Sequence, residues 1–224
     1  MLRILKVVAG LAAVVGAILV GLQLSAAADV SAEQLLLKSS DLPPGSQVQI
    51  RGPLIPGSCG NGFIDKDCKD LVQGYITGER VDFMVPLGKV EGASGDQSMA
   101  QAYISHLVYR FSNEQTAANE FQRLAALADS QPNVTIKSQS VGSSARPSIV
   151  FEVTDSEIPI AAHRWFFMWR GQFLIVYSSP GPLQSSALYA TQSNDAQLTQ
   201  KGWEDYNRAV DTLFASVTSR LQSR

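Results

Sequence analysis

The sequence predicts an α+β protein with a single antiparallel β-sheet and amphipathic helices packed on it. Short segments that alternate apolar and polar residues recur between residues 99 and 177, joined by loops that suit antiparallel neighbours. Two longer segments, 112–129 and 194–224, carry apolar residues three or four positions apart, as helices with one buried face do. Because each helix follows a run of strands, the helices are expected to cover a sheet that the strands form together.

The composition is that of an ordinary globular protein. The chain has 224 residues, of which 45% are apolar and 17% charged, and its formal net charge is −2. This length suits one sizeable core, so residues 29–224 are predicted to form a single domain. A mildly acidic chain without a basic run is not expected to bind nucleic acid or an anionic membrane surface.

The N-terminus has the layout of a secretory signal peptide. Arg3 and Lys6 precede an apolar run over 7–24, and small residues at 25–28 suit cleavage after Ala28. The alternative is an uncleaved anchor, because the run approaches the ~20 residues that span a bilayer. Both interpretations predict an extracytoplasmic protein, either secreted or in the cell envelope. Membrane contact would be made only through residues 1–28, and only if they are not cleaved. No cysteine stands directly after the run to carry a lipid.

The two cysteines, Cys59 and Cys68, lie close together in the exported part. In an oxidising compartment this spacing predicts a disulfide. The alternative is a metal site with His106 and His163, but there is no C-x-x-C and the histidines lie on different predicted strands. We therefore predict a disulfide, no metal site and no cofactor.

The first elements are short. Ser31 and Gln34 have the spacing of a capping box, with Ser31 as N-cap of a helix that residues 35–37 complete. Pro43 and Pro44 end it. Residues 47–50 then form a plausible strand, and the glycine- and proline-rich stretch after them is irregular.

The middle of the chain alternates between strands and one helix. Strands are predicted at 72–77 and 79–85, and Pro86 suggests an edge or an end. Residues 99–111 form a long strand, and Ser112 is expected to cap the helix that follows. The buried stripe of that helix is Ala117, Phe121, Leu124, Ala125 and Ala128.

Four further strands are predicted at 134–140, 148–153, 161–170 and 173–177, followed by a last helix that begins near Asn194 or Asp195. Its apolar stripe is Trp203, Tyr206, Val210, Leu213, Phe214, Val217 and Leu221. The chain thus runs twice from strands into an amphipathic helix, which indicates a weak structural duplication.

The most apolar segment outside the N-terminus is the hairpin at 161–179, with Arg170-Gly171 as its expected turn. That turn would place Phe167 opposite Leu174. One face then carries Trp165, Phe167 and Trp169, and the other carries Phe166, Met168 and Ile175. Since both faces are apolar, the hairpin is either covered on both sides or leaves an aromatic face open for a ligand. Trp165, Phe167 and Trp169 are the candidate binding residues.

Catalytic signatures are absent. The sequence contains no G-x-S-x-G, no H-E-x-x-H and no phosphate-binding glycine motif. His106 and His163 lie in strands without a recognisable nucleophile nearby, which favours structural histidines over a catalytic base. The sequence therefore favours binding over catalysis.

Several stretches resemble exported sensor-like and lipoprotein domains of actinobacteria and related bacteria, some of which have a PsbP-like α/β/α sandwich. They are Leu35-Leu36-Leu37 with Asp41-Leu42-Pro43-Pro44-Gly45, Val108-Tyr109-Arg110-Phe111 running into 114–128, and Trp169-Arg170-Gly171-Gln172-Phe173. The resemblance implies a non-enzymatic envelope domain that binds something. It supplies neither a ligand nor site residues.

The sequence is compatible with three functions. The first is an exported binding or sensor-like domain for an apolar small molecule or an envelope protein, bound at the open face of the hairpin or in a cleft beside the C-terminal helix. The second is an envelope hydrolase that uses His106 or His163. The third is a structural or interaction protein whose hairpin is buried on both sides.

Overall fold

A computed structural model describes residues 30–57, 72–89, 99–130, 134–140, 146–153, 163–180 and 200–223. The predicted signal peptide at 1–28 and the predicted Cys59–Cys68 disulfide lie outside these residues. Within them, no helix is both long and apolar enough to cross a membrane.

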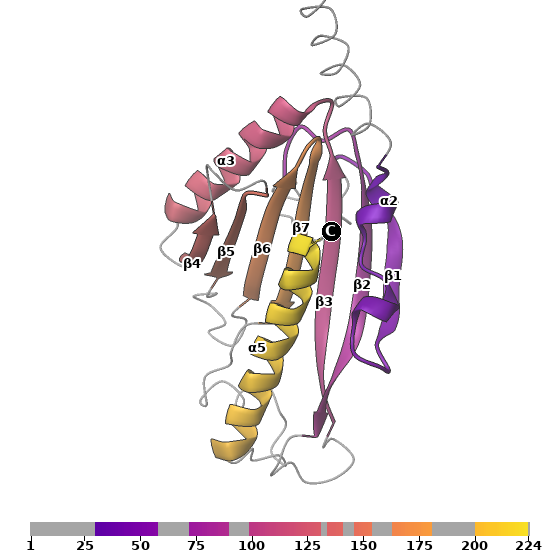
Figure 1. Ribbon diagram of the computed structural model, residues 1–224, viewed down its shortest axis with the longest axis vertical. Helices are drawn as coiled ribbons and strands as arrows, with labels where there is room; N and C mark the ends of the chain where they lie inside the picture. Colours follow the sequence, from indigo (N-terminus) through magenta and orange to yellow (C-terminus); the bar gives the residue numbers. More distant parts are fainter. Residues whose placement is uncertain are drawn as a thin grey trace, which may run out of the picture.

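Seven antiparallel strands form one sheet, as the alternating segments predicted (Figure 1). The strands are β1 (Gln47–Leu54), β2 (Thr77–Lys89), β3 (Met99–Arg110), β4 (Val134–Ser140), β5 (Ser148–Val153), β6 (His163–Arg170) and β7 (Phe173–Pro180). Their order across the sheet is β1-β2-β3-β7-β6-β5-β4. β3 and β7 lie side by side at the centre of the sheet, although they are far apart in the sequence.

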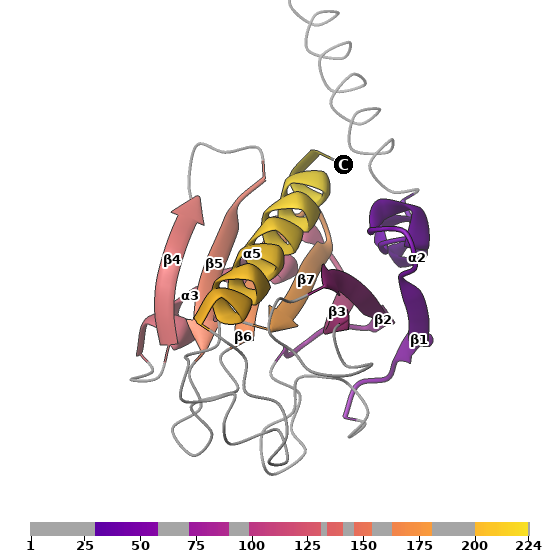
Figure 2. The same ribbon diagram turned by 90° about the horizontal axis from the view of Figure 1, so that it is seen from below.

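Helices cover both faces of this sheet, which makes three layers (Figure 2). The helix α3 (Glu114–Ser130) packs on one face against β4, β6 and β7. On the other face lie α5 (Gln200–Ser223), which packs on β2 and β7, and the short α2 (Ala32–Leu35) with the 3-10 turn η1 (Ser39–Asp41). The predicted α+β class, with helices packed on one antiparallel sheet, is confirmed.

Two apolar clusters hold the layers together, one on each face. The cluster under α5 and α2 includes Leu36, Phe83, Ile104, Phe166, Met168, Ile175, Tyr177 and Val217. The cluster under α3 includes Tyr109, Phe111, Phe121, Leu124, Ile149, Phe167, Leu174 and Val176. The strands β3, β6 and β7 contribute alternate residues to both clusters, because successive side chains of a strand point to opposite faces.

The predicted structural duplication is present in the order of strands and helices along the chain. β1, β2 and β3 lead into α3, and β4 to β7 lead into α5, and the two sets meet where β3 pairs with β7. The two helices, however, pack on opposite faces of the sheet. A single two-fold rotation perpendicular to the sheet would keep both helices on one face, so it does not relate the two halves.

The hairpin turn differs from the prediction by one residue. Arg170 pairs with Phe173, so the loop is Gly171-Gln172, and Phe167 faces Val176 where Leu174 was expected. Gly171 has a φ of 54°, and the favoured two-residue hairpin loops need a positive φ at their first position. The glycine therefore takes the first place in the loop. Since each partner shifts by two positions, the assignment of residues to the two faces is unchanged.

Side-chain caps determine where α2 and α3 begin. The Ser31–Gln34 capping box is present, with Ser31 N–H donating to Gln34 Oε1 at 2.8 Å. The cap of α3 is Asn113 instead of Ser112, because Asn113 Oδ1 accepts from Thr116 N–H at 2.9 Å.

Two strand predictions also need correction. Residues 72–76 are irregular, and the strand begins at Thr77. β2 is an inner strand that continues past Pro86 to Lys89. The proline is tolerated because β1 stops pairing at Met84, which leaves Pro86 paired only with β3.

Candidate functional site

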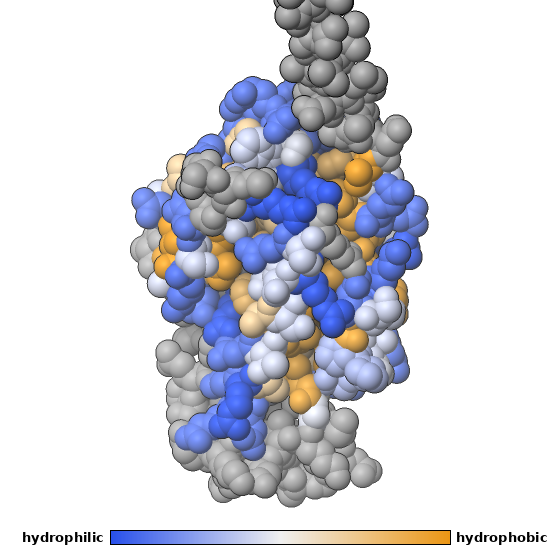
Figure 3. All heavy atoms as spheres, in the orientation of Figure 1, coloured by the Kyte–Doolittle hydropathy of each residue, from blue (hydrophilic) through white to orange (hydrophobic). Residues whose placement is uncertain are grey.

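A groove lies beside α5, and we call it the α5 groove. Its volume is about 480 Å³. It is lined by Asp41, Pro43, Pro86, Leu87, Gly88, Asp205, Arg208, Ala209, Thr212, Leu213, Ser216 and Val217. Figure 3 shows hydrophobic residues alongside the lower half of this helix. One of the two predicted locations for a ligand was a cleft beside the C-terminal helix, and the α5 groove occupies that position.

The last residues of β2 wall the groove because they leave the regular sheet. β1 ends its pairing at Met84, and the register between β2 and β3 shifts between Pro86 and Gly88. Such an irregularity bends a strand and increases its twist. Gly88 has a φ of 95°, which only glycine adopts readily. Residues 86–88 therefore depart from the regular strand and line the groove together with α5.

The helix side of the groove combines buried and small side chains. Leu213 and Val217 are buried in the core below, whereas Thr212 and Ser216 are exposed and short. Ala209, about one turn before Thr212 in the helix, is half-buried. Since Ala209, Thr212 and Ser216 are short, this side of α5 leaves room for a ligand against an apolar floor.

Charged groups line part of the groove. Arg208 Nη1 lies 3.2 Å from Asp205 Oδ1, and the Arg208 side chain is 72% exposed. Asp41 Oδ2 accepts from the Lys38 backbone N–H at 2.6 Å. These groups can offer a hydrogen bond or an ion pair to a ligand whose apolar part lies against Leu213 and Leu87.

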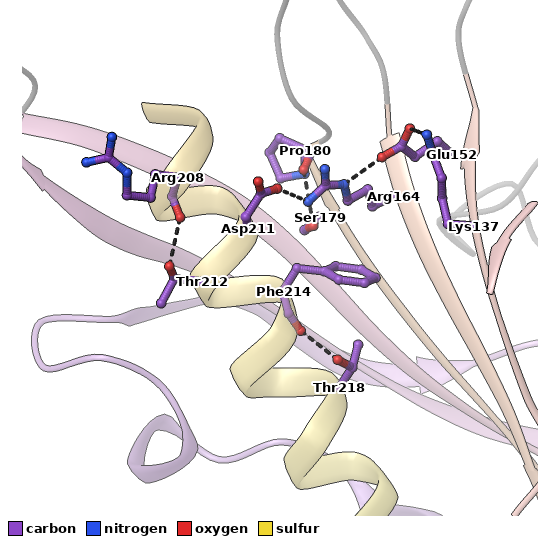
Figure 4. Close-up of polar contacts among 10 residues, drawn as sticks. All are labelled: Lys137, Glu152, Arg164, Ser179, Pro180, Arg208, Asp211, Thr212, Phe214 and Thr218. Carbon is purple, nitrogen blue, oxygen red and sulfur yellow. Dashed lines mark hydrogen bonds and ion pairs between the residues drawn. The ribbon is translucent and has the colours of Figure 1, made fainter. Parts of the chain in front are cut away.

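A set of ion pairs holds α5 in place against the sheet (Figure 4). Arg164 contacts Asp211 of α5, and its Nε lies 2.9 Å from Glu152 Oε1. Lys137 Nζ is 2.8 Å from the other oxygen of Glu152, and the Arg164 guanidinium lies 5.8 Å from the ring centre of Phe214. Burial works against the charged form of Glu152, but hydrogen bonds from Lys137 and Arg164 outweigh it and lower the pKa of Glu152.

The predicted binding residues lie on the face that α3 covers. Phe167 is completely buried in the core, and Trp165 and Trp169 are half-buried and pack against the same cluster. Trp169 Nε1–H donates to the Gly171 carbonyl at 2.7 Å. The centre of the hairpin is thus covered on both sides. That Trp165, Phe167 and Trp169 bind a ligand stays a prediction.

The two histidines lie in different strands, His106 in β3 and His163 in β6. His106 is completely buried on the α5 side, and its Nδ1 accepts from the Leu37 backbone N–H at 3.1 Å. Among the described residues, no three His, Cys, Asp or Glu side chains lie close enough to hold a metal ion.

Sequence reasoning missed a buried charge cluster in β2 and β3. Asp82 is completely buried, with Arg80 Nε 2.9 Å from its Oδ1 and Arg80 Nη2 2.5 Å from its Oδ2. The Tyr103 hydroxyl also donates to Asp82. The hydrogen bond to Asp82 raises the pKa of Arg80, and burial followed by the Asp82 bond raises the pKa of Tyr103. The available signal was the R-x-D spacing, which puts Arg80 and Asp82 on one strand face.

Comparisons with known proteins add one structural similarity. No family model and no curated protein matches the sequence. Among solved structures, the chain is similar to the extracellular domain of PknH from Mycobacterium tuberculosis, with a TM-score of 0.43 and 14% sequence identity. The match covers 83% of this chain and 97% of that one. A similarity at this level does not identify a function.

Proposed function

We propose that this chain is an extracytoplasmic, non-enzymatic binding or sensor-like domain, and that the α5 groove holds its ligand. The observation that carries the proposal is the size and character of the groove. Its volume of about 480 Å³ lies within the ~300–1,000 Å³ typical of small-molecule sites. Its apolar walls and few polar groups also match such sites.

The walls define the chemistry of the ligand. Pro43, Pro86, Leu87, Leu213 and Val217 offer an apolar surface. Asp205 and Arg208 lie among them, with Arg208 largely exposed to solvent. The ligand proposed is therefore a small molecule with an apolar body and one polar or charged group.

A binding role is favoured over hydrolysis by the groups that line the groove. The described lining contains neither histidine nor cysteine. The buried His106 is engaged with the Leu37 backbone beneath the helix layer. A histidine that activates Thr212 or Ser216 as a nucleophile would have to lie within hydrogen-bond reach of that hydroxyl. The described lining offers none.

Filling the groove tests the proposal. The probe is 8-anilinonaphthalene-1-sulfonate, which has an apolar ring system and one charge. Ser216→Trp puts a large ring into the groove from an exposed helix position, and Ala215→Trp places the same ring next to it on an exposed position outside the lining. We expect Ser216→Trp to weaken probe binding at least about tenfold, because the ring occupies the site. Ala215→Trp should leave it unchanged.

Methyl NMR locates the probe independently. Shifts confined to Leu87, Leu213 and Val217 would support the groove. Equal probe affinity in the wild type and both variants, or shifts elsewhere in the molecule, would rule the groove out as the site. Native mass spectrometry of the purified wild type then tests whether a ligand is retained from the cell.

A further inference from the structure

A second hollow lies on the opposite face of the sheet, between α3 and the strands β4, β5 and β6. We call it the α3 pocket. Its volume is about 120 Å³, and its lining is Leu124, Leu127, Ala128, Val134, Phe151, Val153 and Phe167. We infer that the α3 pocket is a binding site, separate from the α5 groove, for a hydrocarbon group about the size of one six-membered ring.

The lining excludes a polar ligand at this depth. All seven lining residues are apolar. The rings of Phe151 and Phe167 stack side by side, with centroids 5.2 Å apart and planes 16° from parallel. A hydroxyl or charged group placed here would lose its water without gaining a hydrogen-bond partner. The part of the ligand that enters is therefore pure hydrocarbon.

The volume sets the size of that hydrocarbon. An apolar protein cavity of about 150 Å³ stays free of water and takes up benzene. At about 120 Å³, the α3 pocket is slightly smaller but is open on one side. It can hold one ring, or the last carbons of an alkyl chain whose remainder stays outside.

The pocket has a buried floor and an accessible mouth. Leu124, Ala128, Phe151 and Phe167 are at most 7% exposed and form the floor. Leu127, Val134 and Val153 are only half-buried and stand at the mouth, near the edge of the sheet.

The sequence explains why space remains there. The buried stripe of α3 ends at Ala128, which lines the pocket, and a larger residue at this position would fill it. β4 is an edge strand that no further strand covers among the described residues. The last turns of the helix therefore pass over the edge of the sheet without closing the pocket.

Benzene is the first probe, and thermal unfolding is the readout. At a concentration about ten times its Kd, benzene should raise the Tm of the wild type by about 3–5 °C, because it binds the folded chain only. Ala128→Leu fills the pocket from its floor and should abolish the rise. Ala126→Leu makes the same change at an exposed position of α3 and should retain it.

Two additional measurements test binding in the α3 pocket if Ala128→Leu does not fold. Leu127→Phe blocks the mouth from a half-buried position and should also abolish the rise in Tm. In the wild type, benzene should shift the methyl resonances of Leu124, Val134 and Val153. Ser216→Trp in the α5 groove should leave both effects intact, which separates this site from the groove.

A second probe distinguishes the two sources of such a hydrocarbon. n-Octyl glucoside, used as monomers, carries an alkyl chain on a neutral head group. A rise in Tm with both probes indicates that the pocket admits the end of a lipid-like chain, and a rise with benzene alone indicates a free ring-sized molecule. Either supports a hydrocarbon site. No rise with either probe, or an equal benzene rise in Ala128→Leu and Ala126→Leu, would overturn it.

Discussion

Removing the Asp82 carboxylate should destabilise the protein far more than removing an exposed acid of the same chain. Asp82 is completely buried, and Arg80, whose side chain is only 17% exposed, holds it with two nitrogens at 2.5–3.0 Å. In Asp82→Ala the Arg80 guanidinium stays in the sheet and loses its ion pair with Asp82. The Tyr103 hydroxyl loses its acceptor at the same time.

The magnitude follows from the burial of the two partners. Breaking a buried ion pair by removing one partner costs about 3–5 kcal/mol, since the remaining charge is left uncompensated. Arg80 retains some contact with solvent, so we expect the lower end of that range, about 3 kcal/mol. The matched exposed pair is Arg51 with Glu33, whose side chains are 55% and 68% exposed. Glu33→Ala should therefore cost about 0–1 kcal/mol.

Urea unfolding followed by tryptophan fluorescence measures both losses. A double variant, Arg80→Met with Asp82→Leu, should recover much of the stability lost in Asp82→Ala, because it replaces both charges with apolar groups of similar size. If Asp82→Ala lies within about 1 kcal/mol of the wild type, or loses no more than Glu33→Ala, the buried charge pair does not contribute as argued.

Three further predictions follow from individual contacts. Gly78→Ala should destabilise the protein by about 1–3 kcal/mol in urea, because an added Cβ would lie 2.8 Å from the Val108 carbonyl oxygen. Gly52→Ala in the neighbouring strand meets nothing within 4 Å, so an equal loss in both would contradict this reason. Tyr103→Phe should flatten the loss of stability at alkaline pH. The raised pKa of Tyr103 in the folded state gives stability that is present below its ordinary value of 10.0 and lost as pH rises through the folded value. Arg164→Ala should flatten the acid limb, since the lowered pKa of Glu152 gives stability present above 4.5 and lost as pH falls through the folded value. Urea midpoints across pH test both, and unchanged limbs would refute them.

Much of the fold could be predicted because its signals are local. The apolar and polar pattern predicted the long strand at 99–111, and the Ser31–Gln34 spacing specified the start of α2. The errors are also local, because in each of them a neighbouring residue takes the predicted role. Asn113 caps α3 in place of its neighbour Ser112, and Gly171 takes the first loop position, where a positive φ is needed.

The sites could not be predicted in the same way, because distant segments form them. The α5 groove combines Asp41 and Pro43 with residues 86–88 and residues 205–217 of α5, and no periodicity connects these parts. The α3 pocket depends on where the helix crosses β4 and β5. Strand order had no local signal either, since β3 and β7 are neighbours only in space. The aromatic residues of the hairpin were conspicuous in the sequence because they build the core.

The crossing of α3 onto the later strands bears on how the chain folds. The strands that α3 covers, β4, β6 and β7, follow it in the sequence, and α5 packs back on β2 of the first half. α5 thus packs on strands of both halves, β2 and β7, whereas α3 packs mainly on strands that follow it in the sequence. The stripe of α3 is therefore fully buried only when those later strands are in place. The central pairing of β3 with β7 joins residues far apart along the chain, and such contacts slow folding because a long loop must close first. The two halves are expected to unfold together in one cooperative transition, and a chain cut between them should regain structure only when both pieces are mixed.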